Sequence, residues 1–362
     1  MRVLITGPAL DDPGGVAGYY RNLLPVLENL PGISSVRYVE IGKTAAKMRI
    51  AHIYMDQRRV SEAVIDFDPS VILVNPSLNI KSFIRDGLWV RRLTKQGRSV
   101  AVFFHGWELP FSAKIDSYGQ SRFYLLFGQA REFIVLAEDF RRKLKKWLPE
   151  VEVELGTTTV EEDLFNIKRI EIDKFLINRP VKLLFMSRLV PGKGADLAIE
   201  AVQLLAEKGV NVLLTIAGDG PDFQTLRNLI DSLGVSDRVV LAGYLRGTQK
   251  QEALSNHDIF VFPSIYGEGM PTVVLEAMAA GMAVVTTPVG GIADFFDPSR
   301  MGRLIENASA KMIAMQVSSI ICSPCQLESI SIFNRSYAYD HFHPEVVAKR
   351  IQAILAKVAM SV

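Results

Sequence analysis

The sequence predicts an α/β protein built from two domains, each with a doubly wound parallel sheet. Three observations carry this prediction. The chain has 362 residues, which suits two domains of ordinary size. Short, continuous apolar runs alternate with helical patterns from end to end, as parallel strands covered on both faces require. The two halves also begin alike, each with a strand, a glycine-containing loop and a helix.

The expected strands are short runs of mainly aliphatic and aromatic residues. In the first half of the chain they are Val3–Ile5, Val71–Val74, Val100–Phe104 and Phe133–Leu136. In the second half they are Leu183–Met186, Val212–Ala217, Val239–Leu241, Ile259–Phe262 and Ala283–Thr286. Helical patterns such as Ala195–Lys208 and Asp222–Leu233 lie between them, which completes the alternation of βαβ units.

The domain boundary is expected in the polar stretch 157–179. We therefore predict an N-terminal domain over residues 1–170 and a C-terminal domain over residues 178–340. A last helix is expected to begin after His343, with Pro344 in its first turn. Its apolar stripe consists of Val347, Ile351, Ile354, Leu355 and Val358.

Composition excludes several classes of protein. The chain carries 41 Lys and Arg against 39 Asp and Glu, a net charge of +2, and so lacks the basic footprint of a nucleic-acid-binding protein. Its two cysteines exclude a disulfide scaffold and fit a reducing compartment. The most apolar window, 271–290, is interrupted by Glu276, Gly281 and Pro288, so no membrane-spanning helix is expected. We expect a cytoplasmic protein, or one attached peripherally to the inner face of the cell membrane.

The most informative segment is GEGMPTVVLEAMAAG, from Gly267 to Gly281. Pro271 suits the first turn of a helix, so Glu268 would lie in the preceding loop and Glu276 about one turn inside the helix. Amides near 269–273 and the positive end of the helix dipole could bind a phosphate, with one carboxylate on each side to accept hydrogen bonds from sugar or ribose hydroxyls. The alternative is a solvated Glu276 and glycines that only shape a turn.

A second segment, SRLVPGKG from Ser187 to Gly194, lies between an expected strand and an expected helix. Arg188 and Lys193 can converge at the carboxyl end of the sheet, where two fixed cations could neutralise a diphosphate without a metal. The segment is not a P-loop, because that motif needs Gly in place of Ser187 and Ser or Thr in place of Gly194. A cationic loop that faces solvent is the alternative.

Two weaker features lie in the first half. Gly14 and Gly15 follow the first strand and would let a ligand approach the backbone closely, although an ordinary strand-to-helix turn fits equally well. Their spacing is not G-x-G-x-x-G, so a nicotinamide or flavin site is unsupported. His105 follows Val100–Phe104 and is expected to face the cleft of an α/β domain, with a satisfied core histidine as the alternative.

Together these features resemble the family 4 glycosyltransferases over nearly the whole chain. Glu268 and Glu276 match the E-x7-E motif of that family, and Arg188 and Lys193 match the basic pair of its GRL-x-x-x-KG motif. Further matches are Gly14 and Gly15 in the N-terminal glycine loop, His105 after an N-domain strand, Ala217–Pro221 and Pro263–Ser264.

The resemblance implies the GT-B fold, in which two Rossmann-like doubly wound domains face a central cleft. The C-terminal helix, 344–362, would cross back to the N-terminal domain. The chain departs from the family pattern where Ser187 replaces the usual glycine and where Leu155–Val160 replaces an NG-V-D signature. In addition, 37–59 matches no pattern of the family, so the acceptor is undefined.

The resemblance further implies transfer of a hexose-type sugar, with retention, from a nucleoside diphosphate sugar to a glycan or glycolipid acceptor, without a cofactor or metal. Arg188 and Lys193 would stabilise the departing diphosphate, and Glu276 would hold the ribose hydroxyls. Glu268 would hold the hydroxyls of the sugar, and His105 would orient the sugar or acceptor. The implied donor-binding residues are Gly14, Gly15, Arg188, Lys193, Glu268, Gly269, Met270, Pro271, Thr272 and Glu276.

Several alternatives remain open. A nucleotide-sugar 2-epimerase or a non-catalytic nucleotide-sugar binding module could share this fold. Asp66 and Asp68 have the spacing of a D-x-D metal-binding motif. The following Pro69 and strand favour the interpretation that this segment is a solvated connector. Cys322 and Cys325 have C-x-x-C spacing without a close fourth ligand. The basic cluster Arg141–Lys146 is expected to be a solvated helix face, with docking on anionic lipid as the alternative.

Overall fold

The computed structural model describes residues 1–12, 14–42, 49–167, 179–322 and 324–360. It divides into two compact units. Unit 1 comprises Met1–Thr159, Gly267–Met270 and Pro344–Val362, and unit 2 comprises Val160–Tyr266 and Pro271–His343. The division after Thr159 precedes the boundary expected at 170–178, and much of the expected linker lies outside the described residues.

Unit 1 is built on a six-stranded parallel sheet in the order β2-β1-β3-β5-β7-β8. Its strands are β1 (Arg2–Gly7), β2 (Ser35–Glu40), β3 (Val71–Val74), β5 (Val100–Phe104), β7 (Glu132–Val135) and β8 (Glu152–Leu155). A separate pair joins β4 (Ser77–Leu78) to β6 (Gly106–Trp107). Because the chain order reverses between β1 and β3, their carboxyl ends form the switch point where ligands bind in such sheets.

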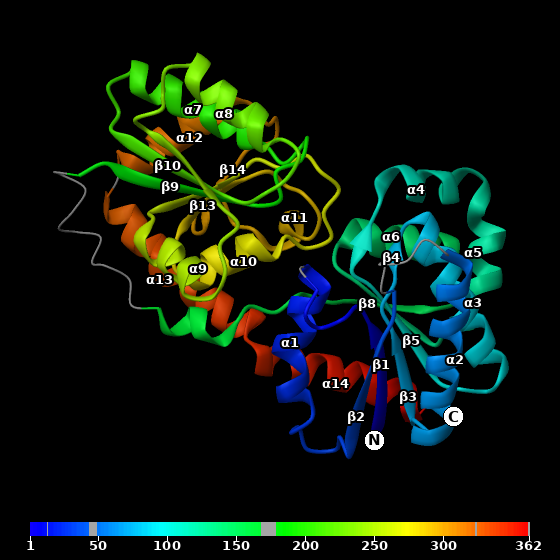
Figure 1. Cartoon of the computed structure of the whole chain (residues 1–362). Coiled ribbons are helices and arrows are strands. Elements are labelled where there is room, and N and C mark those ends of the chain that lie inside the picture. Colours follow the sequence, from blue (N-terminus) through cyan, green and yellow to red (C-terminus); the bar gives the residue numbers. More distant parts are fainter. Residues whose placement is uncertain (13, 43–48, 168–178, 323, 361–362) are drawn as a thin grey trace. The chain divides into compact units, whose positions relative to one another are not determined.

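Helices cover both faces of this sheet (Figure 1). They are α1 (Gly15–Leu27), α2 (Arg49–Phe67), α3 (Ile80–Lys95), α4 (Leu109–Lys114), α5 (Gln120–Phe127), α6 (Glu138–Trp147) and α14 (Pro344–Met360), with a π-helical segment, η1 (Ile115–Gly119), between α4 and α5. Successive residues of one strand enter opposite cores: Val71 and Leu73 pack with α1 and α14, whereas Ile72 and Val74 pack on the other face. This two-sided burial explains the uninterrupted apolar runs of the sequence.

Unit 2 repeats the architecture. Its parallel sheet has the order β11-β10-β9-β12-β13-β14, with β9 (Val181–Met186), β10 (Val212–Ala217), β11 (Val239–Gly243), β12 (Ile259–Phe262), β13 (Ala283–Thr286) and β14 (Gly302–Leu304). This is the doubly wound order of a Rossmann fold, with its switch point between β9 and β12. The helices are α7 (Ala195–Glu207), α8 (Phe223–Ser232), α9 (Gly247–Asn256), α10 (Thr272–Ala279), α11 (Ile292–Phe295), α12 (Ala310–Ile321) and α13 (Pro324–Phe342), with a 3-10 turn, η2 (Glu162–Asn166).

The last helix belongs to unit 1, as predicted. Helix α14 begins at Pro344, and the expected stripe residues Val347, Ile351 and Leu355 are buried against α1 residues such as Tyr19 and Leu23. The two-sheet α/β fold class is confirmed. Among the described residues, no helix combines the length and the apolarity needed to cross a bilayer.

Candidate donor site

The loops after β9 and β12 meet at the switch point of unit 2 and carry most of the predicted donor-site residues. Gly192 O accepts hydrogen bonds from the backbone amides of Ile265 (2.8 Å) and Tyr266 (3.1 Å). Gly194 has φ +84°, and a Cβ there would lie 2.8 Å from Pro263 O. Glycine is therefore required for this loop to pack against the β12 loop.

A third loop, after β10, supports the segment that holds Arg188. The Leu189 amide donates to Asp219 O (2.9 Å), and the Asp222 amide donates to Leu189 O (3.2 Å). A Cβ on Gly218 would lie 1.8 Å from Ser187 O, which no side chain could tolerate. The glycines of Ala217–Pro221 thus let two loops pack backbone to backbone.

The two predicted cations have different environments. Lys193 is buried, and its Nζ lies 4.7 Å from the centroid of the Tyr266 ring and 5.8 Å from that of Phe262. These rings hold the ammonium group by cation–π attraction. Arg188 is exposed at the same carboxyl edge of the sheet, so a buried and an exposed cation occupy one loop.

Glu276 is buried in α10 and belongs to a cluster of three charges. Lys250 of α9 places its Nζ 3.2 Å from Glu276 Oε1 and 2.7 Å from Glu161 Oε1. The alternative of a solvated Glu276 is therefore wrong. Pro271 stands one residue earlier than predicted, as the N-cap of α10 rather than in its first turn. Glu268 lies in the loop before the helix, as expected, within the stretch that groups with unit 1.

The cluster determines the charge states of its members. Burial raises the pKa of Glu276, Lys250 opposes this shift, and Glu161 adds to it. Burial alone would lower the pKa of Lys250, but the carboxylates of Glu276 and Glu161 outweigh it and raise that pKa. Lys250 therefore remains cationic at neutral pH and partly neutralises two acids.

In unit 1, His105 belongs to a hydrogen-bonded network at the carboxyl ends of β3 and β5. Its Nε2 lies 3.1 Å from Asn75 Oδ1, which also accepts from Tyr20 Oη at 2.5 Å. Asn75 Nδ2 donates to Thr6 O at 2.8 Å, so the amide orientation is determined and Nε2 must carry the proton. The ring also packs 3.9 Å from the centroid of Phe103.

Burial lowers the pKa of His105 to about 3. The imidazole is therefore neutral throughout the physiological range, with Nδ1 as an acceptor. It can orient a hydroxyl group by accepting its proton in a hydrogen bond, but it cannot supply a positive charge. Gly14 and Gly15 stand at the start of α1, with Gly14 as its N-cap, at the switch point of the same sheet.

Reasoning from sequence missed three residues that complete these arrangements. Lys250 and Glu161 have no sequence signal, because they reach Glu276 only through the packing of α9 and η2 in unit 2. Asn75 directly follows the strand Val71–Val74, and a polar residue at the carboxyl end of a predicted parallel strand could have been noted. The structure groups Lys193 and Glu276 in unit 2 and His105 in unit 1.

The D-x-D and C-x-x-C motifs differ in their surroundings. Asp68 pairs with Arg98 at 2.6 Å, which agrees with a connector rather than a metal site. Cys322 and Cys325 are exposed free thiols. In the described part of the chain, no cluster of three or more His, Cys, Asp or Glu could hold a metal ion.

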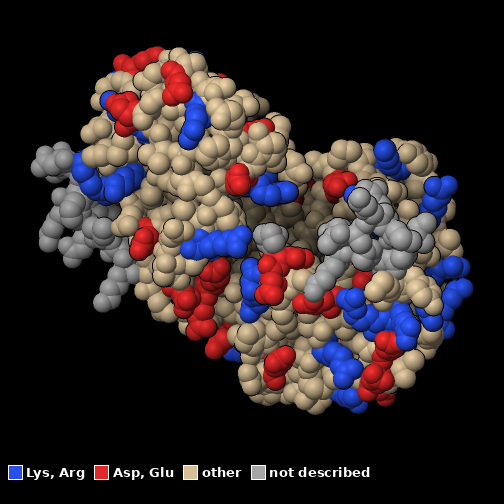
Figure 2. Space-filling view, viewed as in Figure 1, with Lys and Arg blue, Asp and Glu red and all other residues tan. Residues whose placement is uncertain are grey.

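The basic residues of α6 have acidic neighbours. Its cations lie near carboxylates within unit 1: Arg141 near Glu138 (3.0 Å), Arg142 near Asp139 (3.5 Å), Lys143 near Asp139 (3.2 Å), Lys145 near Glu152 (3.9 Å) and Lys146 near Asp116 (3.2 Å). Figure 2 likewise shows charges of both signs interspersed over the visible face. The cluster therefore projects less positive potential than its sequence suggests.

Comparison with known proteins agrees with this fold and these motifs. Residues 167–335 match the family model "Glycosyl transferases group 1". A putative colanic acid biosynthesis glycosyltransferase of Salmonella typhimurium is 25% identical over 71% of this chain and 64% of its own length. A GDP-mannose-dependent alpha-(1-6)-phosphatidylinositol monomannoside mannosyltransferase of Mycolicibacterium smegmatis is 29% identical over 49% of this chain and 48% of its own length.

Among solved structures, Anabaena Alr3699/HepE in complex with UDP and glucose superposes with a TM-score of 0.74 and 15% identity, over 98% of this chain and 99% of that one. At this identity the likeness shows the fold alone, and it places the chain in the GT-B class. The family model and the curated relatives support a family 4-like glycosyltransferase, in agreement with the motifs. The chain spans about half to two thirds of the length of the two curated relatives.

Proposed function

We propose that the protein is a retaining glycosyltransferase that moves a hexose-type sugar from a nucleoside diphosphate sugar to an acceptor hydroxyl. The acceptor class we propose is a bacterial surface polysaccharide or glycolipid, in line with the names of the two curated relatives. One observation supports the donor site above all: Lys193 and Glu276 are both buried polar residues beside the switch point of one sheet.

The diphosphate is the leaving group of the proposed reaction, and negative charge develops on its departing oxygen in the transition state. Positive charge near that oxygen stabilises the transition state. Lys193, held by the rings of Tyr266 and Phe262, is a preorganised cation for this purpose, and Arg188 can fold onto the same phosphates. The N-terminus of α10 adds backbone amides and the positive end of its dipole.

Glu276 is proposed to accept hydrogen bonds from the ribose hydroxyls, since a carboxylate offers two acceptor oxygens. Lys250 opposes the rise in the pKa of Glu276 that burial causes and so favours its ionised form. Glu268 is proposed to bind the transferred sugar. His105, as a neutral acceptor, would orient a hydroxyl of the sugar or the acceptor. The contributions of Gly14, Gly15 and the amides of Gly269 and Met270 stay predictions of the family resemblance.

A thermal-shift screen with UDP-, GDP-, ADP- and TDP-sugars, each with and without EDTA, tests the donor assignment. We expect one nucleotide to stabilise the protein by about 2.7 kcal/mol at a hundredfold excess over its Kd, with no effect of EDTA. Product analysis then separates the alternatives: a transferase needs an acceptor and retains the anomeric configuration, whereas a 2-epimerase converts the donor alone.

Calorimetry on variants locates the site. Lys193→Ala and Glu276→Ala should each weaken nucleoside diphosphate binding by at least tenfold, because each removes a charge-assisted contact. The matched controls are Lys208→Ala and Glu207→Ala, which change exposed residues at the far end of α7. Unchanged affinity in both site variants would remove the assignment.

A further inference from the structure

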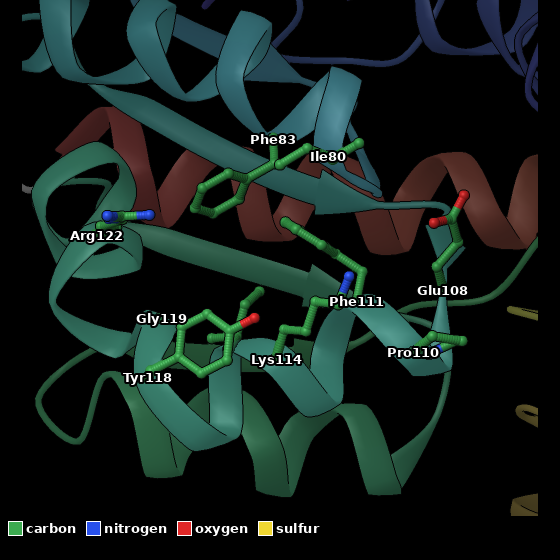
Figure 3. Close-up of a pocket in the computed structure, with 10 residues that line it drawn as sticks. Ile80, Phe83, Glu108, Pro110, Phe111, Lys114, Tyr118, Gly119 and Arg122 are labelled. Atoms are coloured by element: carbon green, nitrogen blue, oxygen red, sulfur yellow. The ribbon is translucent and has the colours of Figure 1, made fainter.

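Unit 1 contains an apolar cavity of about 400 Å³ that the proposed reaction does not use. Phe83 of α3, Phe111 of α4 and Ile115 of η1 line it, together with the exposed side chains of Ile80 and Tyr118. Figure 3 shows the aromatic rings of α3, α4 and η1 around one space. A cavity of this size and lining suits an apolar chain.

The helices around the cavity also carry exposed apolar side chains. Ile80, Ile84 and Leu88 are 54%, 46% and 40% exposed, and their i, i+4, i+8 spacing places them on one face of α3. Tyr118 of η1 and Tyr124 and Leu125 of α5 are also exposed. We call these six residues the α3–α5 surface; Gly87 allows the close packing of α3 on α5, since a Cβ there would lie 2.9 Å from Leu126.

Three basic residues lie on the helices that surround the cavity. Lys114 and Arg122 line the cavity, and Lys81 follows Ile80 on the first turn of α3; all three are exposed. None of the three forms an ion pair with another residue that the structure describes. Glu108 is an acid at the cavity, and Figure 3 shows it at the opposite end from Arg122.

This combination distinguishes the α3–α5 surface from α6. On α6 the cations are paired with neighbouring acids, and the apolar residues Phe140, Leu144 and Trp147 are buried. Around the cavity, unpaired cations accompany exposed aliphatic residues and tyrosines, which have an apolar ring and a polar tip suited to a membrane interface. Apolar side chains flanked by basic residues match an anionic lipid bilayer.

We propose that the α3–α5 surface docks unit 1 on a bilayer that contains anionic lipid, with one lipid chain entering the cavity. Ile84 and Leu88 insert among the acyl chains, Tyr118 and Tyr124 lie at the headgroup level, and Lys81, Lys114 and Arg122 contact lipid phosphates. Docking needs no nucleotide sugar. A negative result for docking would therefore not contradict the proposed transferase activity, and a negative result for the transferase activity would not contradict docking.

Vesicle co-sedimentation of the full chain tests the proposal, with phosphatidylcholine alone compared with phosphatidylcholine containing phosphatidylglycerol. Wild type should bind the anionic vesicles, and added salt should weaken binding. Ile84→Gln/Leu88→Gln should lower the partition coefficient at least tenfold while keeping the helix propensity of α3. The matched control, Met315→Gln/Ile332→Gln, changes two exposed apolar helix residues of unit 2 and should bind like wild type.

A second pair of variants separates the two basic regions. Lys81→Gln/Lys114→Gln/Arg122→Gln should reduce binding to anionic vesicles on the order of a hundredfold, since each basic residue contributes about fivefold. Lys143→Gln/Lys145→Gln/Lys146→Gln on α6 should change it by less than about twofold. The reverse ranking, or absence of wild-type binding, would overturn the proposal.

A direct readout completes the test. Tyr118→Trp should acquire a blue-shifted emission on anionic vesicles and be quenched by brominated acyl chains. Sedimentation velocity checks the other occupant of the surface, a second copy of the chain. If Ile84→Gln/Leu88→Gln converts a dimer into a monomer without changing vesicle binding, the lipid proposal is wrong.

Discussion

The ammonium group of Lys250 lies 3.2 Å from the carboxylate of Glu276, the residue proposed to bind the ribose of the donor. The same ammonium group lies 2.7 Å from Glu161, at the beginning of unit 2. A buried acid that must accept hydrogen bonds from a ligand therefore depends on a cation from another helix. Lys250 is a positioning residue, because it acts on the ligand through Glu276.

Replacing Lys250 tests this dependence. Lys250→Met should weaken nucleoside diphosphate binding on the order of tenfold, because Glu276 left buried without its cation takes up a proton. The loss should be larger at pH 6 than at pH 8, because a higher pH favours the ionised carboxylate of Glu276. Calorimetry at both pH values measures the effect.

The conservative variants serve as controls for that experiment. Lys250→Arg should restore most of the affinity, since it restores the charge. Glu161→Gln should have little effect, because it keeps a hydrogen-bond partner for Lys250 and removes an acid that raises the pKa of Glu276. Equal affinity losses in Lys250→Met at the two pH values would point to a purely structural role.

Gly218→Ala should strongly destabilise unit 2. A Cβ at this position would lie 1.8 Å from Ser187 O, so the loop that carries Arg188 must move. We expect a loss of about 3 kcal/mol or more in the free energy of unfolding, measured by denaturant titration. Gly234→Ala is the matched control: its φ is also positive but its Cβ would meet open space, so about 1 kcal/mol is expected.

His105 should make the protein less stable in acid. Its pKa is lowered to about 3 in the folded state, so between about pH 3 and 6.5 the unfolded chain binds a proton that the folded chain does not. Stability therefore falls as the pH drops below about 6.5. The thermal midpoint of wild type should decline more steeply from pH 7 to pH 5 than that of His105→Gln, which can still donate to Asn75. Parallel curves would contradict a neutral His105.

Glu132 should have the opposite pH dependence. Burial, with Glu154 as the next cause, raises its pKa to about 7, and its Oε1 has no hydrogen-bond partner in the structure. The folded state thus holds a proton that the unfolded state has lost between about pH 4.5 and 7, and this site costs stability as the pH rises.

Glu132→Gln should therefore stabilise the protein at pH 8, on the order of 1 kcal/mol, and change little at pH 5. Denaturant titration at the two pH values measures the difference. Glu152→Gln, an exposed neighbour on β8, should be neutral at both. Equal effects of Glu132→Gln at pH 5 and pH 8 would show that Glu132 ionises normally.

The sequence predicted every central strand of the two six-stranded sheets and one edge strand, β11, but missed the other three edge strands. Val71–Val74 and Ile259–Phe262 match β3 and β12 residue for residue, because both faces of these strands are buried and the whole run is apolar. The edge strands β2, β8 and β14 were missed. Each is only partly buried, so its sequence contains charged residues and lacks a continuous apolar run.

The sequence by itself determined the two α/β units, the loops at their switch points and the motif residues in those loops. These features depend on local periodicity, on glycines and on residues near one another in the chain. Only the tertiary structure decided their electrostatic states: Lys250 comes 26 positions before Glu276, and Asn75 comes 30 positions before His105. Burial and charge act through space rather than along the chain, which is why spacing alone could not predict the buried Lys250–Glu276 pair, a neutral His105 or the paired cations of α6.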